Sequence, residues 1–470
     1  MNKKLKLFLE NFLFYGGLSM LQKALPFITL PIITRLLKDP TSYGIADMFN
    51  LIISFGSAIA VLGIYDAVFR EFFEDKENRE YQKRVTATGL NIVLISGTII
   101  MISIILCSTL ISKILFKSYQ YKNLVILSAI GILISTLNSL IISPTRMRNQ
   151  RKIFFITGIT FPILGFIITY VLIRLGYTYE ALIYGTIGMS LISLIIFYIL
   201  NKKDFSLKIF DKKIAKELFR IGLPLVPTFL IYWIFHSMDR VMINRMLNGS
   251  ELGIYSVGAK VSSVSQLIYT AFAGGWSYFS FSTMKDKNQV EINSKVFEYL
   301  GIISFFVYIL AQPFIKPVFN IFFEGEYIRG QEVFSFLFLS PLILMLFQTV
   351  GNQVIIIKKS YLSTLSLIIG AILNIILNFI FIKSHGIFGA AFSTLNSYMV
   401  SVVIMCIVCY KNKLFVISKR FLSVVILLLI GIYLNFFFKE CVYYKIVYTI
   451  DFILIVILYF KDLKLLLKSR

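Results

Sequence analysis

The sequence predicts an all-α polytopic membrane protein with about 14 transmembrane helices. Of its 470 residues, 57% are hydrophobic and 15% are charged, whereas a soluble globular chain is about 25% charged. Apolar segments of roughly 20 residues recur along the whole chain, and each can cross about 30 Å of hydrocarbon as a helix. Helices are expected throughout, because lipid offers no partners to free backbone N–H and C=O groups.

The apolar segments are separated by short polar turns. In chain order the expected spans cover residues 12–34, 43–65, 86–111, 121–143, 154–174, 180–200, 221–244, 252–281, 296–321, 331–357, 361–383, 386–410, 421–438 and 444–460. The stretch before the first span is basic, like the start of a signal peptide. No small-residue cleavage site follows it, so the first span is expected to be retained.

Lysine and arginine predict the orientation of these spans. With a cytoplasmic N-terminus, the inner connections carry 32 of the 47 basic residues and the outer connections carry 12. Cytoplasmic loops of membrane proteins are enriched in these residues, so both termini are expected inside. The same bias accounts for the formal net charge of +23, and nucleic acid is therefore not an expected partner.

The second half of the chain echoes the first at an offset near 210 residues. The stretch TRLLKDPTSYGIADM from Thr34 resembles NRMLNGSELGIYSVG from Asn244, and Arg35 aligns with Arg245. Each stretch joins the end of one span, a polar turn and a Gly-Ile pair that opens the next span. Six spans per repeat give both copies the same orientation, as in transporters built from parallel repeats.

The repeat predicts two six-helix lobes around a central cavity, followed by two extra C-terminal helices. We assign residues 1–200 to an N-lobe with spans 1–6, residues 221–413 to a C-lobe with spans 7–12, and residues 414–470 to the two extra spans. Residues 201–220, NKKDFSLKIFDKKIAKELFR, form a cytoplasmic linker. Its mixture of lysines and apolar residues is typical of an amphipathic helix on the anionic inner leaflet; a solvated linker is the alternative.

Ionisable residues inside the expected spans are concentrated in the first two helices of each lobe. Lys23 lies in span 1, Asp47 in span 2, Asp239 and Arg240 in span 7, and Lys260 in span 8. A charge near mid-membrane costs a few kcal/mol and usually faces the protein interior or a water-filled cavity. No other span is expected to hold a comparable buried charge.

These five groups have an excess of positive charge, so a cavity lined by them would be electropositive and suited to an anionic substrate. Asp239 and Arg240 are adjacent and point about 100° apart, so at least one of them needs a partner elsewhere. The alternative is a set of structural ion pairs that lock the two lobes together. Arg35, near a span end, could simply extend its guanidinium to the interface.

Motifs for enzymatic chemistry are missing from the sequence. It contains no G-x-x-x-x-G-K-[ST], H-E-x-x-H or G-x-S-x-G, and only two histidines. Cys406 and Cys409 form a C-x-x-C inside a span, but no second ligand pair accompanies them, so no metal site is expected. A transporter is therefore favoured over an enzyme.

Four stretches, in this order, resemble signatures of the Wzx-type O-antigen and capsule flippases, within the multidrug/oligosaccharidyl-lipid/polysaccharide exporter superfamily. LPIITRLLKDPTSYGIADMF is similar to the family's span 1–2 region and PTRMRNQRKIF to its turn between spans 4 and 5. IGLPLVPTFL resembles its start of span 7, and SMDRVMINRMLNGSELGIYSVGAKVS its span 7–8 region, with an Asp-Arg pair before the turn. The resemblance covers essentially the whole chain.

The resemblance implies transport of an undecaprenyl-pyrophosphate-linked oligosaccharide from the inner to the outer leaflet of a bacterial cytoplasmic membrane, by alternating access. The product would enter surface polysaccharide such as lipopolysaccharide O-antigen or capsule, with a polymerase and chain-length machinery as further partners. Lys23, Arg240, Lys260 and Arg35 would attract the pyrophosphate or acidic sugars. Asp239 or Asp47 would couple transport to H⁺ or Na⁺, with no other cofactor.

Three other functions stay open at this point. A peptidoglycan-precursor flippase also has fourteen spans. A drug/cation antiporter of the same superfamily usually has twelve spans and an acidic cavity. A membrane glycan polymerase needs large outer loops bearing catalytic arginine or histidine, and the loops here are short.

Overall fold

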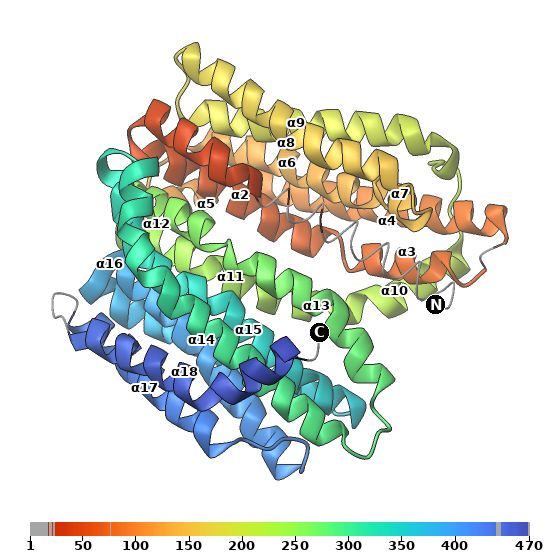
Figure 1. Ribbon diagram of the computed structural model, residues 1–470. Coiled ribbons are helices and arrows are strands. Elements are labelled where there is room, and N and C mark those ends of the chain that lie inside the picture. Colours follow the sequence, from red (N-terminus) through yellow and green to blue (C-terminus); the bar gives the residue numbers. More distant parts are fainter. Residues whose placement is uncertain (1–16, 18–20, 22–23, 76, 439–442, 469–470) are drawn as a thin grey trace. The chain divides into compact units, whose positions relative to one another are not determined.

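The computed structural model describes residues 17, 21, 24–75, 77–438 and 443–468, and all regular elements in these ranges are helices (Figure 1). Most of the first half of the first expected span, including Lys23, lies outside the described residues. The labelled α-helices are α2 (Pro40–Ala60), α3 (Ile64–Phe72), α4 (Arg79–Leu106), α5 (Ser108–Phe116), α6 (Lys122–Ile141), α7 (Ser143–Met147), α8 (Arg151–Arg174), α9 (Tyr179–Asn201), α10 (Lys212–Gly222), α11 (Val226–Met246), α12 (Gly249–Ser262), α13 (Ser265–Ser282), α14 (Gln289–Phe322), α15 (Gln331–Ile356), α16 (Tyr361–Lys411), α17 (Lys419–Phe437) and α18 (Tyr443–Lys468).

The predicted class, an all-α polytopic membrane protein, is confirmed. Eleven helices of the described part are long and apolar enough to cross a membrane, and a shorter apolar helix, Ala24–Leu37, precedes them. One of the eleven, α16, is two helices that meet at Gly386, where φ is 58° and ψ is −139°. Glycine adopts this region without strain, so the turn expected between residues 383 and 386 is a sharp backbone reversal.

Two expected spans are each divided in the structure. The span expected at 86–111 ends with α4 at Leu106, and α5 follows as a separate helix. The span expected at 252–281 consists of α12 and α13. At that break the hydroxyls of Ser262 and Ser263 donate to the carbonyls of Gly258 and Lys260, at 2.8 and 2.6 Å. Such bonds from side chain to backbone bend helices.

Asparagine, aspartate and serine side chains fix several helix starts. Asp39 accepts a hydrogen bond from the Thr41 N–H at 2.9 Å, and Pro40 follows it in the first turn of α2. Asp211 accepts from two N–H groups at the start of α10. Side-chain caps of this kind satisfy N–H groups that have no partner within the helix, so the polar turns between the apolar runs determine where helices begin.

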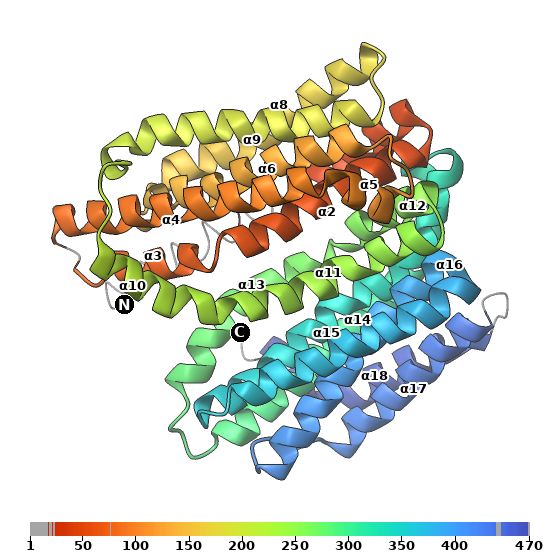
Figure 2. The same ribbon diagram turned by 180° about the vertical axis from the view of Figure 1, so that it is seen from behind.

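The chain forms two compact units. The first comprises the described residues of Met1–Val257 with Phe323–Tyr327 and Ile382–Ile387. In it, α4 and α2 both pack on α6, and α10 packs on α3 and α4 (Figure 2). Ile214, Ala215 and Leu218 of α10 are buried in the core that these helices share. The apolar face of the 201–220 segment therefore contacts protein.

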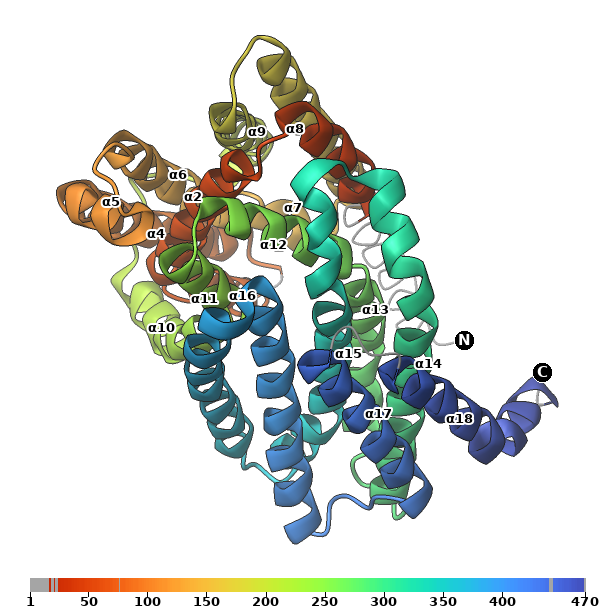
Figure 3. The same ribbon diagram turned by 90° about the vertical axis from the view of Figure 1, so that its left-hand side faces the viewer.

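The second unit comprises Gly258–Phe322, Ile328–Phe381 and Phe388–Arg470 as far as they are described. Within it α13 and α14 pack against α15, and α17 pairs with α18 (Figure 3). The most apolar part of the segment Gly325–Ile356, which contains α15, is 89% buried, so α15 is the central helix of this unit. By contrast, α8 in the first unit is 6% buried over its most apolar part, as expected of a helix that faces lipid.

Candidate functional site

The backbones of α2 and of the first part of α12, residues 249–257, approach each other unusually closely within the first unit. A Cβ atom added at Gly44 would lie 2.0 Å from the carbonyl oxygen of Gly249, and one added at Gly253 would lie 1.9 Å from that of Pro40. Small residues allow membrane helices to cross at this distance. Gly44 and Gly253 are the glycines of the repeated Gly-Ile pair, so the two copies of the repeat meet at this crossing.

One helical turn beyond the crossing, equivalent positions of the two repeats form a hydrogen bond. Asp47 is three residues after Gly44, and Ser256 is three residues after Gly253. The Ser256 hydroxyl donates to Asp47 Oδ2 at 2.8 Å. Both side chains are buried, with 7% and 1% exposure respectively. The repeat therefore brings this acid and its counterpart together.

Asp239 and Arg240 of α11 complete the cluster. Arg240 Nη1 lies 3.7 Å from Asp47 Oδ1, so Asp47 is the distant partner that the Asp-Arg pair required. The Arg240 backbone N–H donates to Asp239 Oδ1 at 2.8 Å, and the Tyr255 hydroxyl donates to Asp239 Oδ2. Within this cluster, each pair among α2, α11 and α12 is thus joined by a polar contact.

The charges of this cluster do not balance. Two carboxylates and one guanidinium, all in low-exposure positions, leave one negative charge without a counterpart among them. The predicted excess of positive charge therefore does not apply to these three groups. Buried charges are stable only when they are paired and hydrogen-bonded, so the cluster is suited to taking up one proton or one small cation. Arg240 Nε has no hydrogen-bond partner among the described residues.

The other predicted site residues lie elsewhere. Arg35 ends the helix Ala24–Leu37 and forms an exposed ion pair with Glu324, with Nε and Oε1 3.2 Å apart. Lys260 is exposed and belongs to the second unit. Lys23 is outside the described residues. The structure thus gathers Asp47, Asp239 and Arg240 but does not bring Arg35 into their cluster.

The expectation that no other span holds a buried charge is wrong. Glu298 of α14 is 8% exposed and Asp451 of α18 is 0% exposed. Glu298 is paired with Arg420 of α17, more than a hundred residues away in the sequence, a partnership that no local pattern indicates. Tyr255 and Ser256 were also missed as partners of the acids, although the Gly-Ile-Tyr-Ser motif contains both.

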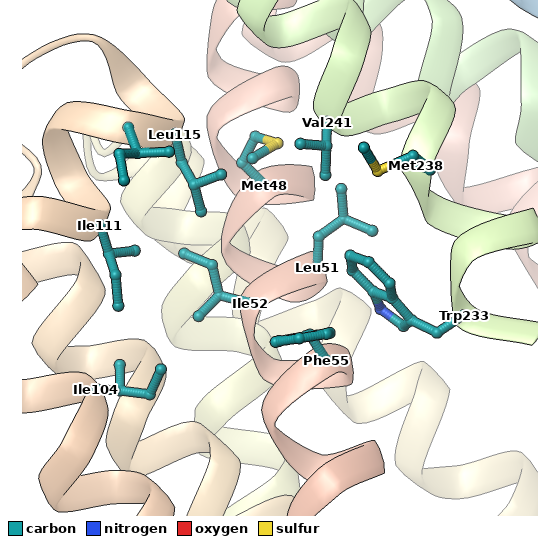
Figure 4. A pocket seen from close by; sticks show the side chains of 11 residues that line it. Met48, Leu51, Ile52, Phe55, Ile104, Ile111, Leu115, Trp233, Met238 and Val241 are labelled. Atoms are coloured by element: carbon teal, nitrogen blue, oxygen red, sulfur yellow. The ribbon is translucent and has the colours of Figure 1, made fainter. Parts of the chain in front are cut away.

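An apolar pocket of about 260 Å³ lies beside the cluster, in the same unit. Figure 4 shows side chains of α2, α4, α5 and α11 converging on it. Trp233 and Phe55 form one wall, with ring centroids 4.7 Å apart, and the Trp233 N–H donates to Ser54 at 3.0 Å. The pocket's apolar lining suits hydrocarbon, because burying apolar surface away from water is favourable.

Comparisons with known proteins agree with this architecture. The family described as "Polysaccharide biosynthesis protein" matches residues 32–315. A probable low-salt glycan biosynthesis flippase, Agl15 of Haloferax volcanii, is 25% identical over 409 residues, which are 85% of this chain and 81% of that protein. An uncharacterised membrane protein of Methanocaldococcus jannaschii, MJ1068, is 27% identical over 259 residues, 52% of this chain and 50% of that protein.

Solved structures share the fold at low sequence identity. The lipid II flippase MurJ in an inward closed conformation aligns with a TM-score of 0.69 and 15% identity, covering 96% of this chain and 99% of that one. An inward-facing MATE family multidrug transporter of the MOP superfamily aligns with a TM-score of 0.63 and 16% identity, covering 83% and 94%. Transporters of both kinds therefore have this helical architecture.

Proposed function

The chain belongs to the polysaccharide biosynthesis protein family, and on this basis we propose that it is a flippase for a lipid-linked glycan. The substrate is an undecaprenyl-pyrophosphate-linked oligosaccharide, moved from the cytoplasmic to the outer leaflet of a bacterial cytoplasmic membrane. The family match over residues 32–315 carries this proposal, and the flippase relative that spans 85% of the chain supports it. The product enters surface polysaccharide such as O-antigen or capsule, and a polymerase with chain-length machinery acts after it.

Alternating access by two six-helix lobes, residues 1–200 and 221–413, is the proposed mechanism. Both termini are cytoplasmic, in keeping with the excess of basic residues in the inner connections. Lys23, Arg240, Lys260 and Arg35 attract the pyrophosphate or acidic sugars of the substrate. Movement of an anion outward across an inside-negative membrane is favourable by about 2.3 kcal/mol per charge per 100 mV, so the direction of transport does not require ATP.

Asp47 and Asp239 are the proposed coupling acids. Their cluster with Arg240 has one carboxylate more than it has cations, so it can bind a proton or Na⁺ in one conformation and release it in another. An ion bound there changes the net charge at the junction of α2, α11 and α12. If the three helices move apart in the other conformation, the cation binds there with a different free energy. Coupling requires such a difference in binding free energy between the two conformations.

The lysine roles can be tested by single substitutions. Lys23→Ala and Lys260→Ala are each expected to abolish glycan display while leaving the amount of protein in the membrane unchanged, because a missing cation weakens anion binding without opening a packed core. Quantitative blotting of membranes beside staining of surface glycan measures both quantities. Normal display with either variant would remove that lysine from the substrate site.

The function itself is tested in a strain deleted for this gene. The expected result is accumulation of complete lipid-linked repeat units on the inner leaflet and loss of surface polysaccharide, both restored by the intact gene. Complete units that reach the outer leaflet but stay unpolymerised would indicate a polymerase instead. Accumulation of peptidoglycan precursor, with arrest of growth, would indicate a flippase of that precursor.

A further inference from the structure

Asp451 is a buried acid that the proposed transport cluster does not use. It lies in α18, near the middle of the candidate span Tyr443–Phe460, and it is 0% exposed. Neither oxygen of its carboxyl group has a hydrogen-bond partner among the described residues. Buried polar groups in proteins are nearly always hydrogen-bonded, so an exception of this kind needs an explanation.

The surroundings of Asp451 follow from the buried stripe of α18. Tyr448, Asp451, Ile455 and Tyr459 are all buried and recur at intervals of three or four residues, the spacing of one helix face. Tyr448 and Tyr459 both bond to α14: the Tyr448 hydroxyl is 2.9 Å from that of Tyr308. The Tyr459 hydroxyl donates to Glu298 at 2.7 Å. Asp451 therefore lies between two polar contacts, in the layer where α18 packs on α14 and α17.

The other acids of this layer are compensated. Glu298 accepts a hydrogen bond from Arg420 Nε at 2.8 Å, and Asp462 accepts one from Arg420 Nη1 at 2.7 Å. The tyrosines that α14 and α18 bring to this stripe are Tyr308, Tyr444, Tyr448 and Tyr459. Arg420 is engaged near one end of the helices. The lysines Lys316 and Lys445 line the neighbouring cavity, but neither oxygen of Asp451 has a hydrogen-bond partner among the described residues.

The energetics favour a proton as the compensating charge. An ionised carboxylate buried without a partner costs many kcal/mol, and such a group becomes neutral instead. A metal ion needs several oxygen ligands, and no group of three or more His, Cys, Asp or Glu residues in the described part could hold one. A proton needs only the carboxyl oxygen itself.

A polar cavity lies one helical turn from the acid. It has a volume of about 720 Å³ and is lined by residues of α14, α15, α16, α17 and α18, among them the polar Tyr448, Gln312, Ser335 and Asn435 and the charged Lys316, Glu332 and Lys445. Ser335 donates to Gln312 at 2.9 Å in its wall. Tyr448 precedes Asp451 by three residues, or about 4.5 Å along the helix. A proton therefore has a polar, roomy path to within one turn of Asp451.

We propose that Asp451 is a proton-binding site of the C-terminal helix pair, and that it exchanges its proton with water in this cavity when α18 moves. In the structure described here the group is the neutral acid; on release it becomes a carboxylate and the proton passes to water, with no other bond changed. Its role as a coupling site rests on the proposed flippase function. Proton binding itself does not.

Proton binding is tested through stability as a function of pH. A group that holds its proton in the native state but loses it on unfolding makes stability fall as pH rises. The unfolding temperature of the wild type, relative to that of Asp451→Asn, is therefore expected to fall as the pH rises from about 5 to about 9. Asp462→Asn is the control: it removes the acid that is paired with Arg420, and its difference from the wild type is expected to stay the same over this pH range. A constant difference for Asp451→Asn would overturn the proposal.

A chemical readout checks the same site in protein reconstituted into phosphatidylglycerol–phosphatidylethanolamine nanodiscs. The apolar reagent dicyclohexylcarbodiimide reacts with protonated carboxyl groups, and peptide mass spectrometry locates the adduct. Asp451 is expected to be modified, less so as pH rises, while the ion-paired Glu298 is not. Equal modification of both acids would contradict a distinctive protonated state at Asp451.

Coupling is tested in vesicles that contain lipid-linked oligosaccharide. A pH gradient is expected to accelerate flipping by the wild type, and the fold stimulation is expected to fall to about one in Asp451→Asn. If the pH gradient leaves the rate of flipping by the wild type unchanged, the coupling role is overturned. Absence of flipping under all conditions would overturn the proposed function and leave the stability result to decide the proton site.

Discussion

Replacing Gly253 by alanine places a methyl group at the point where α12 crosses α2. The new Cβ would lie 1.9 Å from the carbonyl oxygen of Pro40 and 2.7 Å from its carbonyl carbon. Both obstructing atoms belong to the backbone, so no change of rotamer relieves the clash. To restore an ordinary contact of 3.4 Å, the two helices must separate by about 1.5 Å.

The cost of this separation has two parts. Overpacking a close contact costs about 1–3 kcal/mol. A shift of the same size, one turn further along, stretches the 2.8 Å bond between Ser256 and Asp47 beyond hydrogen-bond length. A buried oxygen that loses its partner costs about 1–3 kcal/mol more. The expected loss of stability for Gly253→Ala is therefore about 2–6 kcal/mol.

Thermal unfolding of the purified protein in detergent measures this loss, and α9 supplies a matched control. At Gly188 an added Cβ meets nothing within 4 Å. Alanine is the better helix former, so Gly188→Ala is expected to gain about 0.5–1 kcal/mol. Gly253→Ala should unfold well below both the control and the wild type. An unfolding temperature at or above that of Gly188→Ala would refute the close crossing of α2 and α12.

Three further predictions concern single sites in the first unit. Arg240→Ala should lower the free energy of unfolding by about 3–5 kcal/mol, because it leaves two buried acids without their cation. Adding Asp47→Asn should recover part of this loss. Strictly additive effects of the two substitutions on the free energy of unfolding would argue against an Arg240–Asp47 ion pair. Gly386→Ala should destabilise the protein by about 1–3 kcal/mol, because alanine is strained at this positive φ. The measurement is a lower unfolding temperature. An unchanged unfolding temperature would contradict the backbone reversal at Gly386. Arg35→Ala should change stability by less than about 1 kcal/mol, because its partner Glu324 is exposed. It should reduce glycan display less than the lysine variants do, and complete loss of display would contradict this.

The fold class could be predicted because it depends on the length and spacing of apolar segments, and both are visible in the sequence. The internal repeat could also be predicted from the sequence, and it indicated the helices whose charged groups meet. Asp47 lies in the second span of the first repeat, and Asp239 and Arg240 lie in the first span of the second repeat. The breaks after Leu106 and Ser262 were not predicted. Both fall inside segments that were expected to be single spans. The break after Ser262 lies in the serine-rich stretch KVSSVSQ, where hydrogen bonds from serine side chains to the backbone bend the helix.

Pairings between distant residues account for most of what was missed. No residue near Glu298 in the sequence indicates that its partner is Arg420. The residues around Asp451 form no pattern that would predict whether this acid is buried or exposed. The electropositive cavity predicted from five charged groups stays a prediction. The described cluster contains only Asp47, Asp239 and Arg240 of these five, and its own balance of charge is negative.

The bond between Ser256 and Asp47 bears on how a duplicated gene diverges. Two separate copies of an identical half-sized protein would have to present the same residue at this crossing, either two acids or two hydroxyls. Two facing carboxylates repel or must share a proton, and two hydroxyls carry no charge at all. Once the two copies have separate coding sequences, one can keep the acid while the other supplies its donor. Their fusion into one polypeptide then ensures that the acid and its donor are always made together, in equal amounts.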